Sequence, residues 1–246
     1  MTALATLTTM ETRLLTREWA AMVFAFVMPP MMMLVLAGVF ANDTDVFGGA
    51  NGSDYYVAGY LGVPLGALSL VGLPVMLASY RELGVLRRFE AFGVPTAKVV
   101  AAQALVTGAL VVLGALLVIA MAAPTYGVPA VEEPLAVAVG FVAGAATMIS
   151  LGVALGLAAP TARAAQALGL LAFMPMWLLG GGGPPQPVMT DAMQRISDVL
   201  PLWHTTSAIR EPWLGTSGSG DNLLALAGWL AVGLVATALL LRRRSA

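Results

Sequence analysis

The sequence lacks cysteine and contains a single histidine, and each shortage excludes a kind of chemistry. Without cysteine the chain has neither a disulfide framework nor a thiolate metal site. His204 belongs to no cluster of Asp, Glu or Cys residues, so it is a poor candidate for a metal ligand or a catalytic base. A G-x-x-x-x-G-K-[ST] phosphate loop is also missing, which excludes ATP binding by that route. The sequence predicts that the chain is not an enzyme and has no cofactor or metal of its own.

Charged residues are scarce as well, at 10% of the 246 residues, whereas hydrophobic residues make up 59%. Soluble domains carry roughly 25% charged residues. The net charge is −1 and no basic face exists to neutralise phosphates, which excludes nucleic acid as a partner. This balance predicts an integral membrane protein surrounded by lipid, with residues 1–246 forming one membrane domain.

Six long stretches contain no charged residue at all. Such a run predicts a transmembrane helix, because about 20 residues rising 1.5 Å each cross the hydrocarbon core. Backbone groups in lipid must be hydrogen-bonded within the segment, and the alternating pattern of barrel strands is missing. The sequence therefore predicts an all-α membrane protein with six transmembrane helices. They lie at about residues 19–40, 55–80, 99–123, 135–159, 164–183 and 222–241.

The segment before the first stretch has its own helical pattern. Leu4, Leu7, Met10 and Leu14 fall on one side of a helix. This predicts an N-terminal amphipathic helix over residues 4–18 in the cytoplasmic interface, with a frayed tail as the alternative. A cleaved signal peptide is the alternative for the first stretch itself, but its 22 residues exceed the usual 7 to 15.

Lys and Arg are distributed unevenly among the segments between the stretches, and these two residue types set membrane topology. The N-terminal segment, the loops after the second and fourth stretches, and the C-terminal segment hold ten of the twelve. The other loops hold only Arg195 and Arg210, together with nine of the thirteen acidic residues. The distribution predicts that both termini are cytoplasmic.

Residues 184–222 are too many for a simple hairpin loop and contain two helical patterns. Pro187 suits a helix start, and Pro201 ends the first pattern. We expect two short extracellular helices that cap the outer mouth, with ordinary surface helices as the alternative. The patterns are Met189, Met193, Ile196 and Leu200, and then Leu202, Thr206, Ile209 and Trp213.

Glycines and prolines mark special positions inside the stretches. Glycines four residues apart allow close helix packing, either within one chain or at a dimer seam, and prolines kink helices. The run Gly180–Gly183 suits a flexible extracellular turn. None of the six stretches contains an ionisable residue, which argues against a carrier coupled to protons or sodium. The positions are Gly62, Gly66, Gly140, Gly144, Gly152 and Gly156, with Pro29, Pro30, Pro64, Pro74 and Pro175.

The loop after the second stretch, residues 80–95, reads YRELGVLRRFEAFGVP. It resembles the R-E-x-G-x-L-x-R-x-x-A-x-x-V-P loop of ABC type-2 permeases, the membrane subunits of daunorubicin-type drug and polysaccharide exporters. Residues 175–215 also resemble the family's fifth span and outer segment. Two departures, Leu179-Gly180 for Ser-Gly and Met189-Thr190 for Met-Pro, lie in that outer segment.

The resemblance implies a division of labour between subunits. A separate ABC ATP-binding subunit would bind ATP and Mg, and a second permease chain, identical or different, would complete the pathway. The loop would be the family's coupling helix, which contacts the ATPase; anchoring at anionic headgroups is the alternative for its arginines. Val85, Phe89 and Phe92 would form its apolar face, and we assign the substrate path to Phe173, Met176 and Trp177. The expected contacts are Arg81, Glu82, Gly84, Val85, Leu86, Arg87, Arg88, Phe89 and Phe92.

The resulting hypothesis is a permease subunit of an ATP-driven exporter in the plasma membrane of a bacterium. Its substrate would be a hydrophobic or amphipathic drug-like or lipid-like molecule. A polysaccharide or lipid-linked glycan is the alternative, and aromatic residues at the entrance would favour it through sugar stacking. Aromatic residues make up only 7% of the chain, which favours the first substrate class. A membrane scaffold or immunity protein without transport is the alternative of another class.

Overall fold

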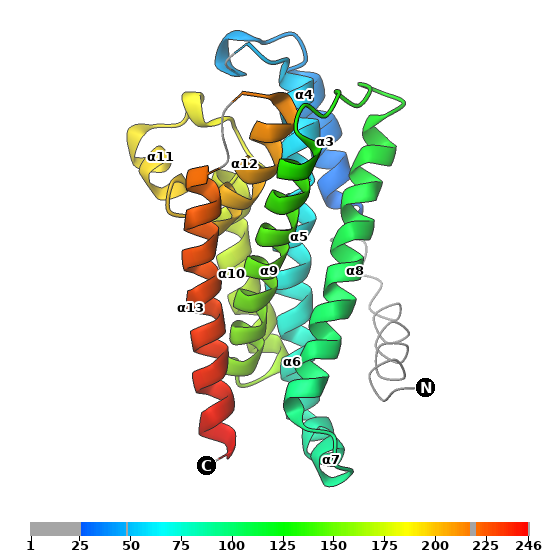
Figure 1. Ribbon diagram of the computed structural model, residues 1–246, viewed down its shortest axis with the longest axis vertical. Coiled ribbons are helices and arrows are strands. Elements are labelled where there is room, and N and C mark those ends of the chain that lie inside the picture. The colour runs from blue at the N-terminus through cyan, green and yellow to red at the C-terminus, as the bar shows by residue number, and fades with distance from the viewer. Residues whose placement is uncertain (1–25, 48, 217–219, 246) are drawn as a thin grey trace.

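The computed structural model describes residues 26–47, 49–216 and 220–245, and this part of the chain is a bundle of long helices (Figure 1). Short connections join neighbours that run in opposite directions. The α-helices are α3 (Met28–Val39), α4 (Gly52–Tyr60), α5 (Val63–Ala67), α6 (Leu73–Glu82), α7 (Val85–Ala91), α8 (Thr96–Ala122), α9 (Pro134–Ala158), α10 (Ala162–Leu179), α11 (Asp191–Ser197), α12 (Pro201–Leu214) and α13 (Gly220–Ser245). A π-helical turn, η2 (Leu68–Gly72), joins α5 to α6, and η1 (Asp45–Phe47) and η3 (Gln186–Val188) are 3-10 turns.

Five helices are long and apolar enough to cross a membrane, which confirms five of the six predicted spans by length and composition. They are Gly52–Glu82, Thr96–Ala122, Pro134–Ala158, Ala162–Leu179 and Gly220–Arg242. The described part of the first predicted span is α3, an apolar helix of 12 residues. Residues 19–25 of that span and the predicted amphipathic helix at 4–18 lie outside the described residues.

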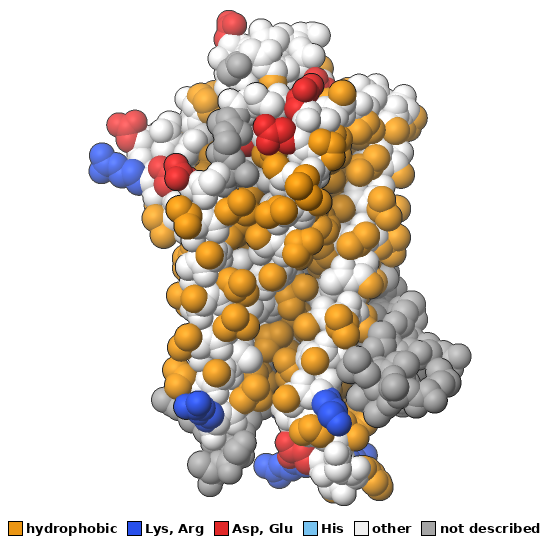
Figure 2. All heavy atoms as spheres, in the orientation of Figure 1, with side chains coloured by type: hydrophobic (Ala, Val, Ile, Leu, Met, Phe, Trp, Pro, Cys, Tyr) orange, Lys and Arg blue, Asp and Glu red, His pale blue; other side chains and the backbone are white. Residues whose placement is uncertain are grey.

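The surface supports a membrane environment. Figure 2 shows a broad band of hydrophobic side chains around the middle of the bundle, with most Lys and Arg at the α7 end and most Asp and Glu at the opposite end. Leu171 on α10 is 72% exposed, and Val142 on α9 is 66% exposed. Large apolar side chains gain nothing by facing water, so these faces fit contact with lipid acyl chains.

The glycines of α9 serve packing within this chain. A methyl group built on Gly152 would lie 1.9 Å from the carbonyl oxygen of Ser69 in η2, and one on Gly140 would lie 2.2 Å from the carbonyl oxygen of Ala208 in α12. Only glycine permits such close backbone contact. Of the two alternatives left by the sequence, intramolecular packing accounts for the glycine stripe. A methyl group on Gly144 would lie 2.5 Å from Cγ2 of Thr205, and one on Gly156 would lie 2.9 Å from Cα of Pro74.

Prolines coincide with irregular backbone in the long helix Gly52–Glu82. The helix is interrupted by a turn at residues 61–62, just before Pro64, and the π-turn η2 precedes Pro74. Pro175 lies inside α10. A proline lacks the amide hydrogen and displaces the carbonyl four residues earlier, so the helix changes its hydrogen-bond pattern at these points.

Two predictions for the end of the bundle opposite α7 need correction. The fifth span ends at Leu179 rather than residue 183, because Gly180–Gly183 form a buried turn. These glycines are required by close packing rather than by flexibility: a methyl group on Gly180 would lie 3.0 Å from the amide nitrogen of Trp203. Both predicted short helices exist, as α11 and α12, but α12 is not a surface helix. It is buried on nearly all sides, between α4, α9 and α13.

Candidate functional site

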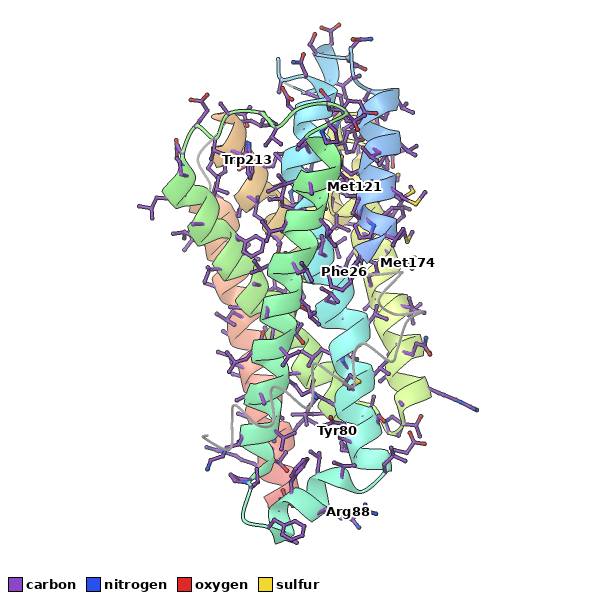
Figure 3. All side chains as sticks on the ribbon, turned by 90° about the vertical axis from the view of Figure 1, so that its right-hand side faces the viewer. Phe26, Tyr80, Arg88, Met121, Met174 and Trp213 are labelled. Carbon is purple, nitrogen blue, oxygen red and sulfur yellow. The ribbon has the colours of Figure 1, made fainter. Side chains whose placement is uncertain are left out.

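The residues that resemble a coupling helix form the α7 end of the bundle. Gly84 has a φ of +69°, in the left-handed region that glycine adopts without a Cβ clash, and this single residue turns the chain from α6 into α7. Leu86 is 5% exposed and packs with Tyr80 of α6 and Val99 of α8. Figure 3 shows Arg88 projecting away from the bundle at this end. The sequence therefore places a short helix on a packed base, with charge on its outer side.

The three apolar residues expected to form one docking face differ in exposure. Phe92, which ends α7, is 85% exposed. Val85 and Phe89 are half-buried, because they pack on the cluster formed by Tyr80, Leu86 and Val99. The aromatic group most available to a partner is consequently Phe92 rather than Phe89. Arg87 and Arg88 are exposed beside it.

Arg81, expected to be a docking charge, binds the chain's own backbone. Its Nη1 donates to the carbonyl oxygens of Leu157 at 2.7 Å and Ala159 at 2.6 Å, and lies 3.3 Å from that of Gly156. These carbonyls belong to the last turn of α9 and to its C-cap residue Ala159, where no further helical amide follows to bind them. Arg81 is therefore a cap for α9.

Glu82 caps the beginning of the next helix, α10, as an acceptor. Its Oε2 accepts a hydrogen bond of 2.9 Å from the backbone amide of Ala162, the first residue of α10. The side chain of Thr161 accepts from the amide of Ala164, so two free amides at this helix start are satisfied. The adjacent residues Arg81 and Glu82 thus hold the two sides of the turn between α9 and α10.

A polar cavity of about 370 Å³ opens beside these residues. It lies between α6, α7, the start of α8 and the turn after α9. Its walls therefore come from the segment that resembles a coupling helix and from Pro160, which is distant in the sequence. The hydroxyl of Thr96 donates to the carboxylate of Glu90 at its rim. The lining residues are Arg81, Glu82, Leu86, Arg87, Glu90, Thr96 and Pro160.

The residues assigned to the substrate path lie in the C-terminal half of α10. Phe173 is 2% exposed, and Trp177 is partly buried. Both line a crevice between α3, α5 and α10 whose volume is about 10 Å³, room for no more than about one water molecule. Met176 is partly buried but does not line that crevice. The crevice is closed to any organic substrate in this conformation.

A buried arginine at the end of the bundle opposite α7 was not predicted from the sequence. Arg210 on α12 is 4% exposed, and its guanidinium carbon lies 4.1 Å from the ring centre of Tyr55 and 5.1 Å from that of Trp203. Nη2 donates to the hydroxyl of Ser207 at 2.9 Å, while Nη1 has no hydrogen-bond partner among the described residues. The arrangement is a cation between two aromatic rings. The signal in the sequence was an arginine between two tryptophans, Trp203 and Trp213, in a segment predicted to be a short extracellular helix.

Two tyrosines of α4 form hydrogen bonds with the Gly180–Gly183 turn at the end of the bundle opposite α7. Tyr60 donates from its hydroxyl to the carbonyl oxygen of Gly182 at 2.6 Å, and Tyr56 to that of Gly183 at 3.1 Å. The imidazole of His204 makes hydrogen-bond contacts with the side chain of Asn222 and the carbonyl oxygen of Asp198. These contacts hold α4, α10, α12 and α13 together.

Comparison with known proteins identifies the family of the chain. The model of the ABC-2 type transporter family matches residues 2–213, which include the segment from Arg81 to Phe92. No curated protein matches the sequence. Because the family match covers most of the chain and the structure has the expected apolar helices, this multi-pass membrane chain belongs to the ABC-2 type transporter family, as a permease.

Proposed function

We propose that the chain is the membrane-spanning subunit of an ATP-driven exporter whose ATP is hydrolysed by a separate ABC ATP-binding subunit. The observation that carries the proposal is the α7 end: a short helix on a packed base, with Phe92 85% exposed beside two exposed arginines. An isolated exposed aromatic with flanking charge suits a partner groove, where the aromatic provides binding energy and the charges orient the approach. A second permease chain, identical or homologous, would complete the translocation path.

The substrate class we propose is a hydrophobic or amphipathic drug-like or lipid-like molecule. Arg210 is the one charged side chain among the described residues that is buried, so the interior offers few charged groups for an ionic cargo. The aromatic rings near the α12 end contact one another instead of an open cavity, as Tyr56 does with Phe40 and Tyr60. They are therefore not presented for stacking against sugar rings, which disfavours the glycan alternative.

The transport proposal is tested by reconstitution. The permease would be purified with its ATP-binding partner, placed in vesicles, and supplied with a fluorescent amphipathic cation or a labelled phospholipid. We expect ATP-dependent movement only when both subunits are present, and no ATP binding by the permease alone. Stoichiometric ATP binding by the isolated chain, or equal movement without ATP, contradicts the proposal.

The orientation we propose places the α7 end in the cytoplasm, because Lys and Arg concentrate there. The chain has no cysteine, so a single introduced cysteine reports one position. Asn51→Cys and Ala97→Cys both replace exposed residues, at opposite ends of the bundle. In intact cells a membrane-impermeant maleimide should label position 51 at once and position 97 only after permeabilisation. Labelling of position 97 in intact cells would show that the α7 end is extracellular and would contradict the proposed orientation.

A further inference from the structure

Arg81 and Glu82 connect the helix before α7 to a second pair of membrane helices. We propose that they are positioning residues which make α7 and the α9–α10 turn move as one body. This inference rests on the proposed function, because it concerns how a displacement of α7 by the ATP-binding subunit reaches the membrane helices. Through this pair, the displacement acts on α9 and α10 as well as on α6 and α8.

The α9–α10 turn cannot satisfy all of its own backbone hydrogen-bonding groups and needs side chains from another helix. Pro160 has no amide hydrogen, so the sequence Ala159-Pro160-Thr161 cannot cap the carbonyls at the end of α9 by continuing the helix. Arg81 provides the missing donors, and Glu82 provides an acceptor for the first amide of α10. Both charges also match the helix dipoles, with the cation at a C-terminus and the anion at an N-terminus.

The contact is stiff as well as specific. Ala78 of α6 packs against Ala159 and Ala165 in a fully buried cluster of small side chains, so the backbones approach closely beside the hydrogen bonds. On the side of α7, only two residues, Leu83 and Gly84, lie between Glu82 at the end of α6 and the start of α7. Because this connection is short, a displacement of α7 is transmitted to Arg81 and Glu82.

The same helix contains places where its remote part can bend. The π-turn η2 and the interruption at residues 61–62 break the regular hydrogen-bond ladder between α4 and α6. Such irregular turns are common at functional sites and points of bending. The helix is thus regular from Leu73 to Glu82, where it joins the α9–α10 turn, and irregular farther from α7.

The first test separates docking from coupling in the reconstituted complex. Arg81→Met removes the donors but keeps an unbranched side chain, and Glu82→Ala removes the acceptor. Both variants should bind the ATP-binding subunit as wild type does, yet transport roughly 2- to 30-fold less substrate per ATP hydrolysed, the range expected for perturbed coupling. Glu82→Gln retains an acceptor oxygen and should restore most of the ratio, and Arg81→Lys should restore part of it.

The second test measures the movement directly. Spin labels on Leu83→Cys and Arg163→Cys, both exposed, report the distance between the α6–α7 junction and the start of α10. In the wild-type background this distance should be the same with and without ATP in the complex, and adding Arg81→Met should make it broader or ATP-dependent. An unchanged distance and an unchanged transport ratio in Arg81→Met overturn the inference. Failure of the wild-type complex to couple ATP to transport refutes the proposed function instead, and the label distance in detergent still decides whether Arg81 holds the turn.

Discussion

Replacing Phe92 by alanine is expected to weaken binding of the ATP-binding subunit by about thirtyfold, with no loss of thermal stability in the permease. The expectation follows from truncating an aromatic anchor at an interface, which typically costs about 2 kcal/mol or more. Phe92 is 85% exposed, so its own fold loses almost no packing when the ring is removed. The measurement is a binding titration of the partner against purified permease in one detergent, beside a thermal melt.

Three control variants make the Phe92 result specific. Leu135→Ala changes a residue 79% exposed at the opposite end and should leave partner binding unchanged. Phe89→Ala removes packing on Tyr80 and Leu86, so it should lower the melting temperature as well as binding. Arg88→Ala should have a smaller effect that fades with added salt, because exposed charges are screened. Wild-type binding by both Phe92→Ala and Arg88→Ala would leave α7 as a headgroup anchor.

Replacing Arg210 by alanine is expected to lower the free energy of unfolding by about 2–5 kcal/mol, as for other large-to-small substitutions in a packed interior. The side chain fills space between Tyr55 and Trp203, and its loss removes two cation–π contacts and the hydrogen bond to Ser207. Thermal or denaturant unfolding in matched detergent provides the comparison with wild type.

The matched variant Arg210→Met separates the volume of this side chain from its charge. Methionine fills much of the same space without a charge that must be buried, and Nη1 of Arg210 has no partner among the described residues to lose. Buried charges without full pairing are often replaced by apolar residues at no cost in stability. We therefore expect Arg210→Met to unfold close to wild type. An equal loss in both variants shows that the charge itself stabilises the fold.

The long helices could be predicted from the sequence because the hydrocarbon core imposes a length and excludes charge. The predicted span 99–123 corresponds to Thr96–Ala122, and 135–159 to Pro134–Ala158. The burial of α12 could not be predicted, because polar residues such as Thr205, Thr206 and Arg210 are typical of a helix at the surface. The structure satisfies the two threonines through backbone carbonyls, those of Pro201 and Gly180, so polar residues are accommodated inside.

The candidate site was predictable as a segment but not in its internal contacts. The motif located α7 and Gly84, since a left-handed turn requires glycine there. The roles of Arg81 and Phe89 depend on partners far along the chain: Arg81 binds carbonyls 75 to 78 residues away, and Phe89 packs on a cluster that includes Val99. Local patterns do not reveal such partners, so the division between residues that face a partner and residues that hold the turn required the structure.

The central claim is that an ATP-binding subunit docks at the α7 end, and site-specific photo-crosslinking tests it most directly. A photoreactive phenylalanine analogue would replace Phe92 in one variant and Leu135, at the opposite end, in another, in cells that express the native partner genes. Mass spectrometry then identifies the protein crosslinked at each position. We predict an ABC ATP-binding subunit with a G-x-x-x-x-G-K-[ST] loop at position 92 and none at position 135. Crosslinking of that subunit at neither position, or at both equally, contradicts the account.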